Sequence, residues 1–223
     1  MESNHWPHLG ETLHECRKRI DAIANGRPVQ IVAVTKGFGP EAIIAAQRVG
    51  LNEVGENYAQ EAKAKYETLS ASGAVQPAWH FIGQLQSNKV RHLSEFVSVW
   101  QTVDSASLVH EIAKRAPGAK VMIQVNLSAD SGRGGCSWDD LPVLVEKARA
   151  AELDVVGLMT VGVHGDPEDS RSGFNRLAGQ AVALEIPEVS MGMSGDYEVA
   201  VQEGSTIVRL GSVLFGDRPP RSK

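Results

Sequence analysis

Short runs of β-branched and apolar residues recur along this 223-residue chain, and segments with helical periodicity separate them. This alternation is typical of repeated βα units that build a parallel sheet. Eight runs predict strands, at residues 29–35, 53–55, 79–82, 97–103, 120–127, 155–160, 188–193 and 206–210. Eight strands favour a single (β/α)8 barrel of the TIM type, although an open doubly wound sheet shares the local pattern.

Helical periodicity fills the intervals between these runs. It predicts helices at 41–49, 59–69, 88–92, 106–115, 138–150, 169–184 and 197–203. Ser105 and Ser137 are expected to cap the helices that follow them. An extra amphipathic N-terminal helix over 9–24, ended by Gly26 and Pro28, would close the bottom of the barrel or pack on its side. No linker or charge block divides the chain, so residues 1–223 are expected to form one α/β domain.

Composition excludes several classes of protein. The net charge is −5 and no Lys/Arg cluster is present, so nucleic acid is not an expected partner. No apolar stretch approaches the ~18 residues that suggest a membrane span, and no signal peptide is recognised. Cys16 and Cys136 lack metal-ligand or disulfide spacing, and the histidines are scattered, so no metal is expected. A cytoplasmic protein fits these features.

Barrel proteins place their sites where the carboxyl ends of the strands meet, so the residues after each predicted strand are the candidates. Lys36 follows the first strand, where a neighbouring polar environment would favour loss of its proton and attack on an aldehyde. A solvated surface lysine is an equally good reading of its position alone. Asn57, after the second strand, is expected to be a supporting hydrogen-bond group rather than a catalyst.

The loops after the seventh and eighth strands each carry Gly and Ser, at Ser194 with Gly195 and at Gly211 with Ser212. Backbone N–H groups and hydroxyls in these two loops are where barrels commonly bind phosphate. One such pair would be an ordinary turn, but two at the expected places favour a phosphate pocket. An amine opposite a phosphate pocket fits pyridoxal 5′-phosphate (PLP), which carries both an aldehyde and a phosphate.

Arg209 points into or out of the barrel depending on the strand register. Outward, it would form a peripheral ion pair; inward, it would lie near the phosphate loop. An arginine that donates to the pyridine nitrogen of PLP disfavours protonation of that nitrogen, which predicts limited carbanion chemistry.

Several motifs make the chain resemble the PLP homeostasis proteins, a family whose fold is similar to the N-terminal barrel of alanine racemases. The motifs are V-A-V-T-K at 32–36, G-E-N at 55–57, W-H-F-I-G-Q-L-Q-S-N-K at 79–89, V-D-S at 103–105, G-L-M-T at 157–160, S-M-G-M-S at 190–194, R-L-G-S at 209–212 and F-G at 215–216. By this resemblance Lys36 holds PLP as a Schiff base, Arg209 faces the pyridine nitrogen, and Asn57 lies near the lysine and the ring. It assigns the phosphate to Ser194, Gly195, Gly211 and Ser212.

Two departures from the family pattern are visible. Tyr58 stands where relatives commonly carry arginine after G-E-N, and Arg133 stands where the fifth loop usually carries lysine before glycine. These changes affect accessory contacts to substrates or partners and leave the cofactor residues in place.

The resemblance implies a PLP carrier that acts in vitamin B6 homeostasis and supplies PLP-dependent apoenzymes. Alanine racemases use a second base, a tyrosine from an added C-terminal domain, and none of Tyr58, Tyr66 and Tyr197 matches it. We therefore expect no catalytic residues. Because the added domain supplies much of the dimer surface of the racemases, we also expect a monomer. The alternatives are a weak PLP-dependent racemase or decarboxylase acting through Lys36, and a PLP-free phosphate-binding barrel such as a sugar-phosphate isomerase.

Overall fold

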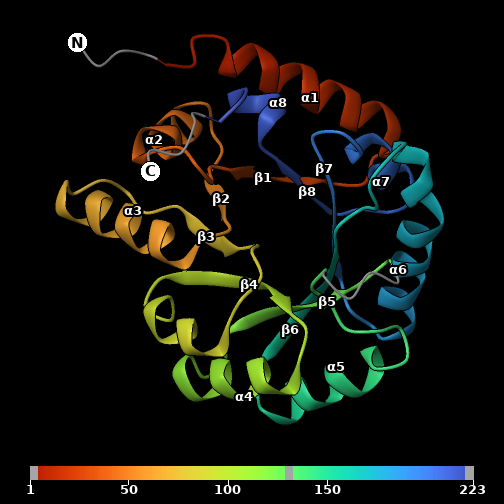
Figure 1. The fold of residues 1–223 in the computed structure, drawn as a ribbon. Coiled ribbons are helices and arrows are strands. Elements are labelled where there is room, and N and C mark those ends of the chain that lie inside the picture. The colour runs from red at the N-terminus through yellow and green to blue at the C-terminus, as the bar shows by residue number, and fades with distance from the viewer. Residues whose placement is uncertain (1–4, 129–132, 219–223) are drawn as a thin grey trace.

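Eight parallel strands close into a barrel in a computed structural model that describes residues 5–128 and 133–218 (Figure 1). The strands are β1 (Gln30–Val34), β2 (Glu53–Glu56), β3 (Ala78–Phe81), β4 (Val97–Val103), β5 (Lys120–Val125), β6 (Asp154–Thr160), β7 (Glu188–Met193) and β8 (Ile207–Leu210). Each strand pairs with the next along the chain, and β8 pairs with β1. This closure confirms the predicted barrel and excludes the open sheet.

Helices surround the barrel (Figure 1). They are α1 (Leu9–Ile23), α2 (Pro40–Arg48), α3 (Ala59–Ala71), α4 (Ala106–Arg115), α5 (Leu141–Ala150), α6 (Arg171–Ala183), α7 (Tyr197–Gln202) and α8 (Ser212–Phe215), with 3₁₀ turns η1 (Ser87–His92) and η2 (Pro167–Ser170). The predicted helix at 88–92 is thus a 3₁₀ turn, and the one at 169–184 begins with another. The short α8 was not predicted, because four residues are too few to show a period.

The two predicted serine caps have different outcomes. Ser105 caps α4 as expected, since its side chain accepts a hydrogen bond from the backbone N–H of Leu108. Ser137 does not begin a helix at residue 138, so that prediction was wrong. Its hydroxyl donates to the Asp140 carboxylate and accepts from the Asp140 N–H, which forms a turn, and α5 begins only at Leu141.

The N-terminal helix packs on the side of the barrel, against α7 and α8, and not across its bottom. Leu9, Leu13, Cys16 and Ile20 form its buried face. They share one apolar cluster with Val208 and Leu210 of β8, whose side chains point outward from the barrel. Because α1 covers the seam where β8 meets β1, it protects the strand pair that closes the sheet.

Successive side chains of a strand point alternately into and out of the barrel. The residues that join apolar clusters with the surrounding helices point outward, so their neighbours in each strand point inward. Val32, Met122, Met159 and Ile207 form an apolar group inside the barrel. These side chains fill part of the interior, as expected for an eight-stranded barrel. Within the described ranges, no helix has the length and apolar character needed to cross a membrane.

Candidate functional site

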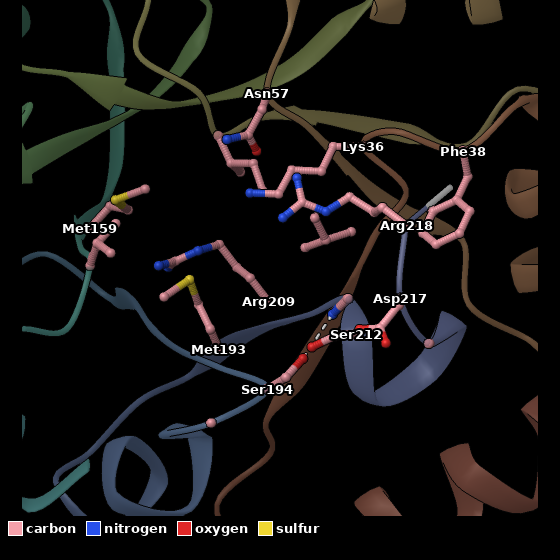
Figure 2. Close-up of a pocket in the computed structure, with 16 residues that line it drawn as sticks. Lys36, Phe38, Asn57, Met159, Met193, Ser194, Arg209, Ser212, Asp217 and Arg218 are labelled. Atoms are coloured by element: carbon pink, nitrogen blue, oxygen red, sulfur yellow. Dashed lines mark hydrogen bonds between the residues drawn. The ribbon is translucent and has the colours of Figure 1, made fainter. Parts of the chain in front are cut away.

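A cavity of about 530 Å³ lies at the carboxyl ends of the strands (Figure 2). Its volume suits a small-molecule ligand. All seven predicted site residues line it, namely Lys36, Asn57, Ser194, Gly195, Arg209, Gly211 and Ser212. Residues far apart in sequence meet there because β8 pairs with β1, which places the last two loops beside the lysine of the first.

Lys36 extends into this cavity from the turn that follows β1 (Figure 2). Its amine forms no hydrogen bond or ion pair with any other residue that the structure describes. Burial lowers the pKa of Lys36 below its ordinary value, and the positive charges of Arg218 and Arg209 lower it further, while Glu56 and Glu61 act in the opposite direction. A lowered pKa increases the neutral fraction of the amine, which is the form that attacks an aldehyde.

Replacing Arg218 with methionine is expected to raise the pKa of Lys36, because one of the charges that disfavour its ammonium form is removed. The neutral amine then appears only at higher pH. Labelling with an amine-reactive reagent, followed by peptide mass spectrometry, reports how Lys36 modification depends on pH. The midpoint should move upward in Arg218→Met and stay in place in Arg218→Lys, which keeps the charge. An unchanged midpoint in Arg218→Met would contradict the role given to Arg218.

Arg209 points into the barrel, which settles the register that the sequence left open. It is 2% exposed, and its two terminal nitrogens donate to the Ser190 hydroxyl at 2.8 Å and to the Thr160 carbonyl at 2.7 Å. Burial lowers the pKa of Arg209 to about 10, and the Asp196 carboxylate opposes this shift. The guanidinium therefore remains charged at neutral pH and lines the cavity beside Met159 and Met193 (Figure 2).

Ser194 joins the two glycine-containing loops. Its hydroxyl oxygen accepts the N–H groups of Gly211 and Val213, each at 3.2 Å. Across residues 5–128 and 133–218, neither the Ser212 hydroxyl nor the Gly195 N–H has a hydrogen-bond partner, and the space above the Gly195 Cα is open. These unused donors, one in the loop before α7 and one at the start of α8, suit an anionic group such as phosphate.

Asn57 reaches the cavity because Gly83 leaves room for its backbone. A Cβ on Gly83 would lie 2.0 Å from the Asn57 carbonyl oxygen, so a larger residue there would displace Asn57. The side-chain oxygen Oδ1 of Asn57 is buried and has no partner among the described residues. Since buried polar atoms are normally paired, this atom indicates a place for a donor group of a ligand.

Four further residues line the cavity that the sequence did not single out: Phe38, Val161, Asp217 and Arg218. Gly216 has a φ of +75°, a left-handed conformation, and the chain beyond it passes close to Gly37, where an added Cβ would lie 2.9 Å from the Arg218 side chain. In the sequence, the available signals for Asp217 and Arg218 were their charge and their position next to F-G at 215–216. No repeating pattern predicts that the backbone turns back toward the cavity here.

A buried ion cluster lies beside the turn that carries Lys36. The ammonium of Lys65, which is 3% exposed, donates to Glu56 at 2.6 Å, to Glu61 at 2.7 Å and to the Thr35 carbonyl at 2.8 Å. Thr35 also donates its hydroxyl to Glu56 at 2.6 Å. Burial raises the pKa of Glu56 to about 7, although Lys65 and Thr35 oppose the shift. These contacts hold Thr35 in place, and they therefore fix the direction in which the backbone runs from Thr35 into Lys36.

The remaining candidates for reactivity have structural roles. Burial raises the pKa of Cys136 to about 12, so its thiol is not a nucleophile at neutral pH. Arg133 donates to the Gly162 carbonyl at 2.8 Å and thus links the fifth and sixth loops. In the part of the chain that the structure describes, no three His, Cys, Asp or Glu side chains are grouped to hold a metal ion.

Comparison with known proteins shows which proteins this chain is similar to. The family model described as "Alanine racemase, N-terminal domain" matches residues 12–219. A relative in Aquifex aeolicus named "Pyridoxal phosphate homeostasis protein" is 36% identical, and the match covers 94% of this chain and 96% of the relative. A protein of the same name in Schizosaccharomyces pombe is also 36% identical, over 93% of this chain and 94% of the relative. The solved structure of PipY from Synechococcus elongatus, with PLP bound, is 31% identical with a TM-score of 0.82 and covers 93% of this chain and 100% of its own.

Proposed function

Because this chain belongs to the family of pyridoxal phosphate homeostasis proteins, which share the alanine racemase N-terminal domain, we propose that it binds PLP reversibly through Lys36 and takes part in vitamin B6 homeostasis. The observation that carries the proposal is the pairing of an unpartnered, half-buried amine with unused phosphate donors in one cavity. The PLP bound to PipY, 31% identical over nearly the whole chain, supports the same ligand here.

The residues present fit each part of PLP. The aldehyde of PLP condenses with a neutral primary amine, releasing one water, and water reverses the bond. The lowered pKa of Lys36 increases the fraction of its amine that is neutral and able to react in this way. We propose that Ser194, Gly195, Gly211 and Ser212 hold the phosphate, that Asn57 contacts polar groups of the ring, and that Arg209 donates to the ring nitrogen. Met159 and Met193 provide apolar surface for the ring.

We favour a carrier over a racemase or decarboxylase because of the proton-transfer groups around the cavity. Among the residues that the structure describes, no tyrosine lines it, so the tyrosine that alanine racemases use as their second base has no counterpart among these lining residues. A charged arginine opposite the ring nitrogen also weakens the ring as an electron sink.

The function is tested by adding PLP to the purified protein and recording its absorbance before and after borohydride reduction. A new violet-blue band and a PLP mass fixed on the Lys36 peptide are the expected results. Absence of both would favour a PLP-free phosphate-binding barrel instead. Exchange of the α-proton of alanine in deuterated water distinguishes the roles: a carrier gives none above the rate of free PLP, and a weak racemase gives catalysed exchange.

We further propose that PLP passes from this protein to PLP-dependent apoenzymes in the cytoplasm, and that the carrier is a monomer. Light scattering measures the mass of the particle against the 23.9 kDa chain. Transfer is measured as the activity gained by a PLP-dependent apoenzyme when the loaded protein replaces an equal amount of free PLP in a buffer that contains a scavenger of free aldehyde.

A further inference from the structure

A chain of hydrogen bonds crosses the inside of the barrel, from the site to the opposite end. It joins side chains of five strands: Arg209 of β8, Ser190 of β7, Gln101 of β4, His80 of β3 and Glu53 of β2. Successive polar atoms lie 2.8, 2.7, 2.6 and 2.7 Å apart. The first four residues are at least 97% buried, whereas the Glu53 side chain, at the amino end of its strand, is 29% exposed.

All donors in this hydrogen-bond chain point in the same direction, from Arg209 toward Glu53. Arginine carries no acceptor, so Arg209 must donate to the Ser190 oxygen, and Ser190 then gives its own proton to the Gln101 oxygen Oε1. The amide group Nε2 of Gln101 therefore faces His80 and donates to its ring nitrogen Nδ1.

His80 consequently has one available tautomer. Because Nδ1 accepts, the proton of the neutral ring sits on Nε2, from which it is donated to the Glu53 carboxylate at 2.7 Å. A positive group at the site is thus connected to a negative group at the far end through three neutral side chains. Reversing any one of them would leave two donors or two acceptors facing each other in a dry interior, which is costly.

Arg209 depends on this arrangement for its position. Among the described residues it has no carboxylate at ion-pair distance, and Asp196 is the negative group that acts on it from further away. One terminal nitrogen donates to Ser190 of β7 and the other to the Thr160 carbonyl of β6. The plane of the guanidinium is therefore fixed by the hydrogen-bond chain on one side and by the Thr160 carbonyl on the other. Arg209 also lines the cavity, where its other N–H groups could meet a ligand.

We propose that Ser190, Gln101 and His80 are positioning residues that hold Arg209 in the orientation in which it meets the ligand, and that they do so as one directed hydrogen-bond chain ending on Glu53. The inference rests on the proposed function only for the identity of that ligand, an aromatic ring with a nitrogen acceptor. Ser190, Gln101, His80 and Glu53 do not line the cavity, so the hydrogen-bond chain would meet the ligand only through Arg209.

The direction of the chain is tested in the protein without PLP, by ¹⁵N NMR of the histidine rings, with His80 assigned from a His80→Gln variant. Wild-type protein should show His80 as the Nε2–H tautomer. In Ser190→Ala the Gln101 amide loses the donor that fixes it and is free to turn, so the two ring nitrogens should move toward a mixture of tautomers. Ser190→Thr keeps a hydroxyl and should keep the wild-type signals.

The effect on the site is tested by PLP binding and absorbance. Ser190→Ala removes a hydrogen bond to the charged Arg209, and Gln101→Leu removes the acceptor that orients the Ser190 hydroxyl. Each change should weaken PLP binding by about tenfold and shift the visible absorbance maximum. Ser205→Ala is the matched control. The Ser205 hydroxyl is as deeply buried as that of Ser190, but it donates to backbone carbonyls that are not part of the hydrogen-bond chain. It should lower thermal stability without moving the affinity or the band.

Two results would overturn the proposal: an Nδ1–H tautomer of His80 in the wild type, or wild-type affinity and absorbance in both folded variants. Failure of the proposed function looks different. In that case wild-type protein itself fixes no PLP on Lys36, while the tautomer of His80, measured without PLP, still decides whether the chain is directed as described.

Discussion

Lys36→Ala protein is expected to lose the visible absorbance band of bound PLP completely, and borohydride should fix no PLP mass on its peptides. Alanine has no amine, whereas the proposed phosphate contacts of Ser194, Gly195, Gly211 and Ser212 remain, so weaker non-covalent uptake should persist. Equilibrium dialysis measures that residual binding, and mass spectrometry after reduction measures the covalent fraction.

Stability separates this result from simple misfolding. Lys36 forms no ion pair with a described residue, and its nearest charged neighbours include Arg209 and Arg218. Removing it therefore relieves repulsion, and the melting temperature should not fall. Lys36→Arg keeps the charge but supplies no neutral amine, so it should behave like the alanine variant. Lys63→Ala, at an exposed position of α3, should keep the band; a band that survives in Lys36→Ala would disprove the assignment.

Lys65→Met is expected to reduce the free energy of unfolding by about 3–5 kcal/mol, because it leaves Glu56 and part of Glu61 buried without their shared cation. Chemical denaturation followed by circular dichroism measures the loss. The neighbouring surface pair of Lys63 and Glu67 on the same helix is the matched control, and Lys63→Met should cost about 0–1 kcal/mol. A second change, Glu56→Gln, should restore part of the loss in Lys65→Met.

The loss in Lys65→Met should grow with pH. Glu56 already has a pKa raised to about 7 in the folded protein, above the value of about 4.5 expected of an unfolded carboxyl. A raised acid pKa contributes stability at low pH that is lost as pH rises through the folded value. Without Lys65 the pKa of Glu56 rises further, so the variant can take up a proton at pH 6 but carries a buried charge at higher pH. An equal loss at pH 6 and pH 8 would exclude this account.

Much of the site was predictable because strand ends in a barrel converge by geometry. Once Lys36, Asn57, Ser194 and Gly211 were placed after strands, the fold alone required them to meet. The direction of Arg209 was not predictable, since both faces of a parallel sheet are buried and alternation does not distinguish inside from outside. The structure resolves it through the Ser190 contact.

His80 shows the same limit more sharply. Its sequence neighbours Trp79 and Phe81 point outward into apolar clusters, so a packed strand histidine was the correct expectation, but its partners come from strands distant in sequence. Arg218 was missed for another reason. Its approach to the cavity depends on the left-handed turn at Gly216 rather than on any repeating pattern.

The pairing of β8 with β1 has a consequence for biosynthesis. Lys36 is synthesised well before Ser194, Arg209 and Ser212, so a nascent chain has no complete site until β8 has been made and has paired with β1. A cofactor that uses the whole site must therefore load after β8 has paired with β1, onto a barrel already sealed. Because PLP would bind only this sealed state, free PLP at 100 times its dissociation constant would stabilise it by about 2.7 kcal/mol. The amount of this protein that survives quality control in a cell would then rise and fall with its vitamin supply.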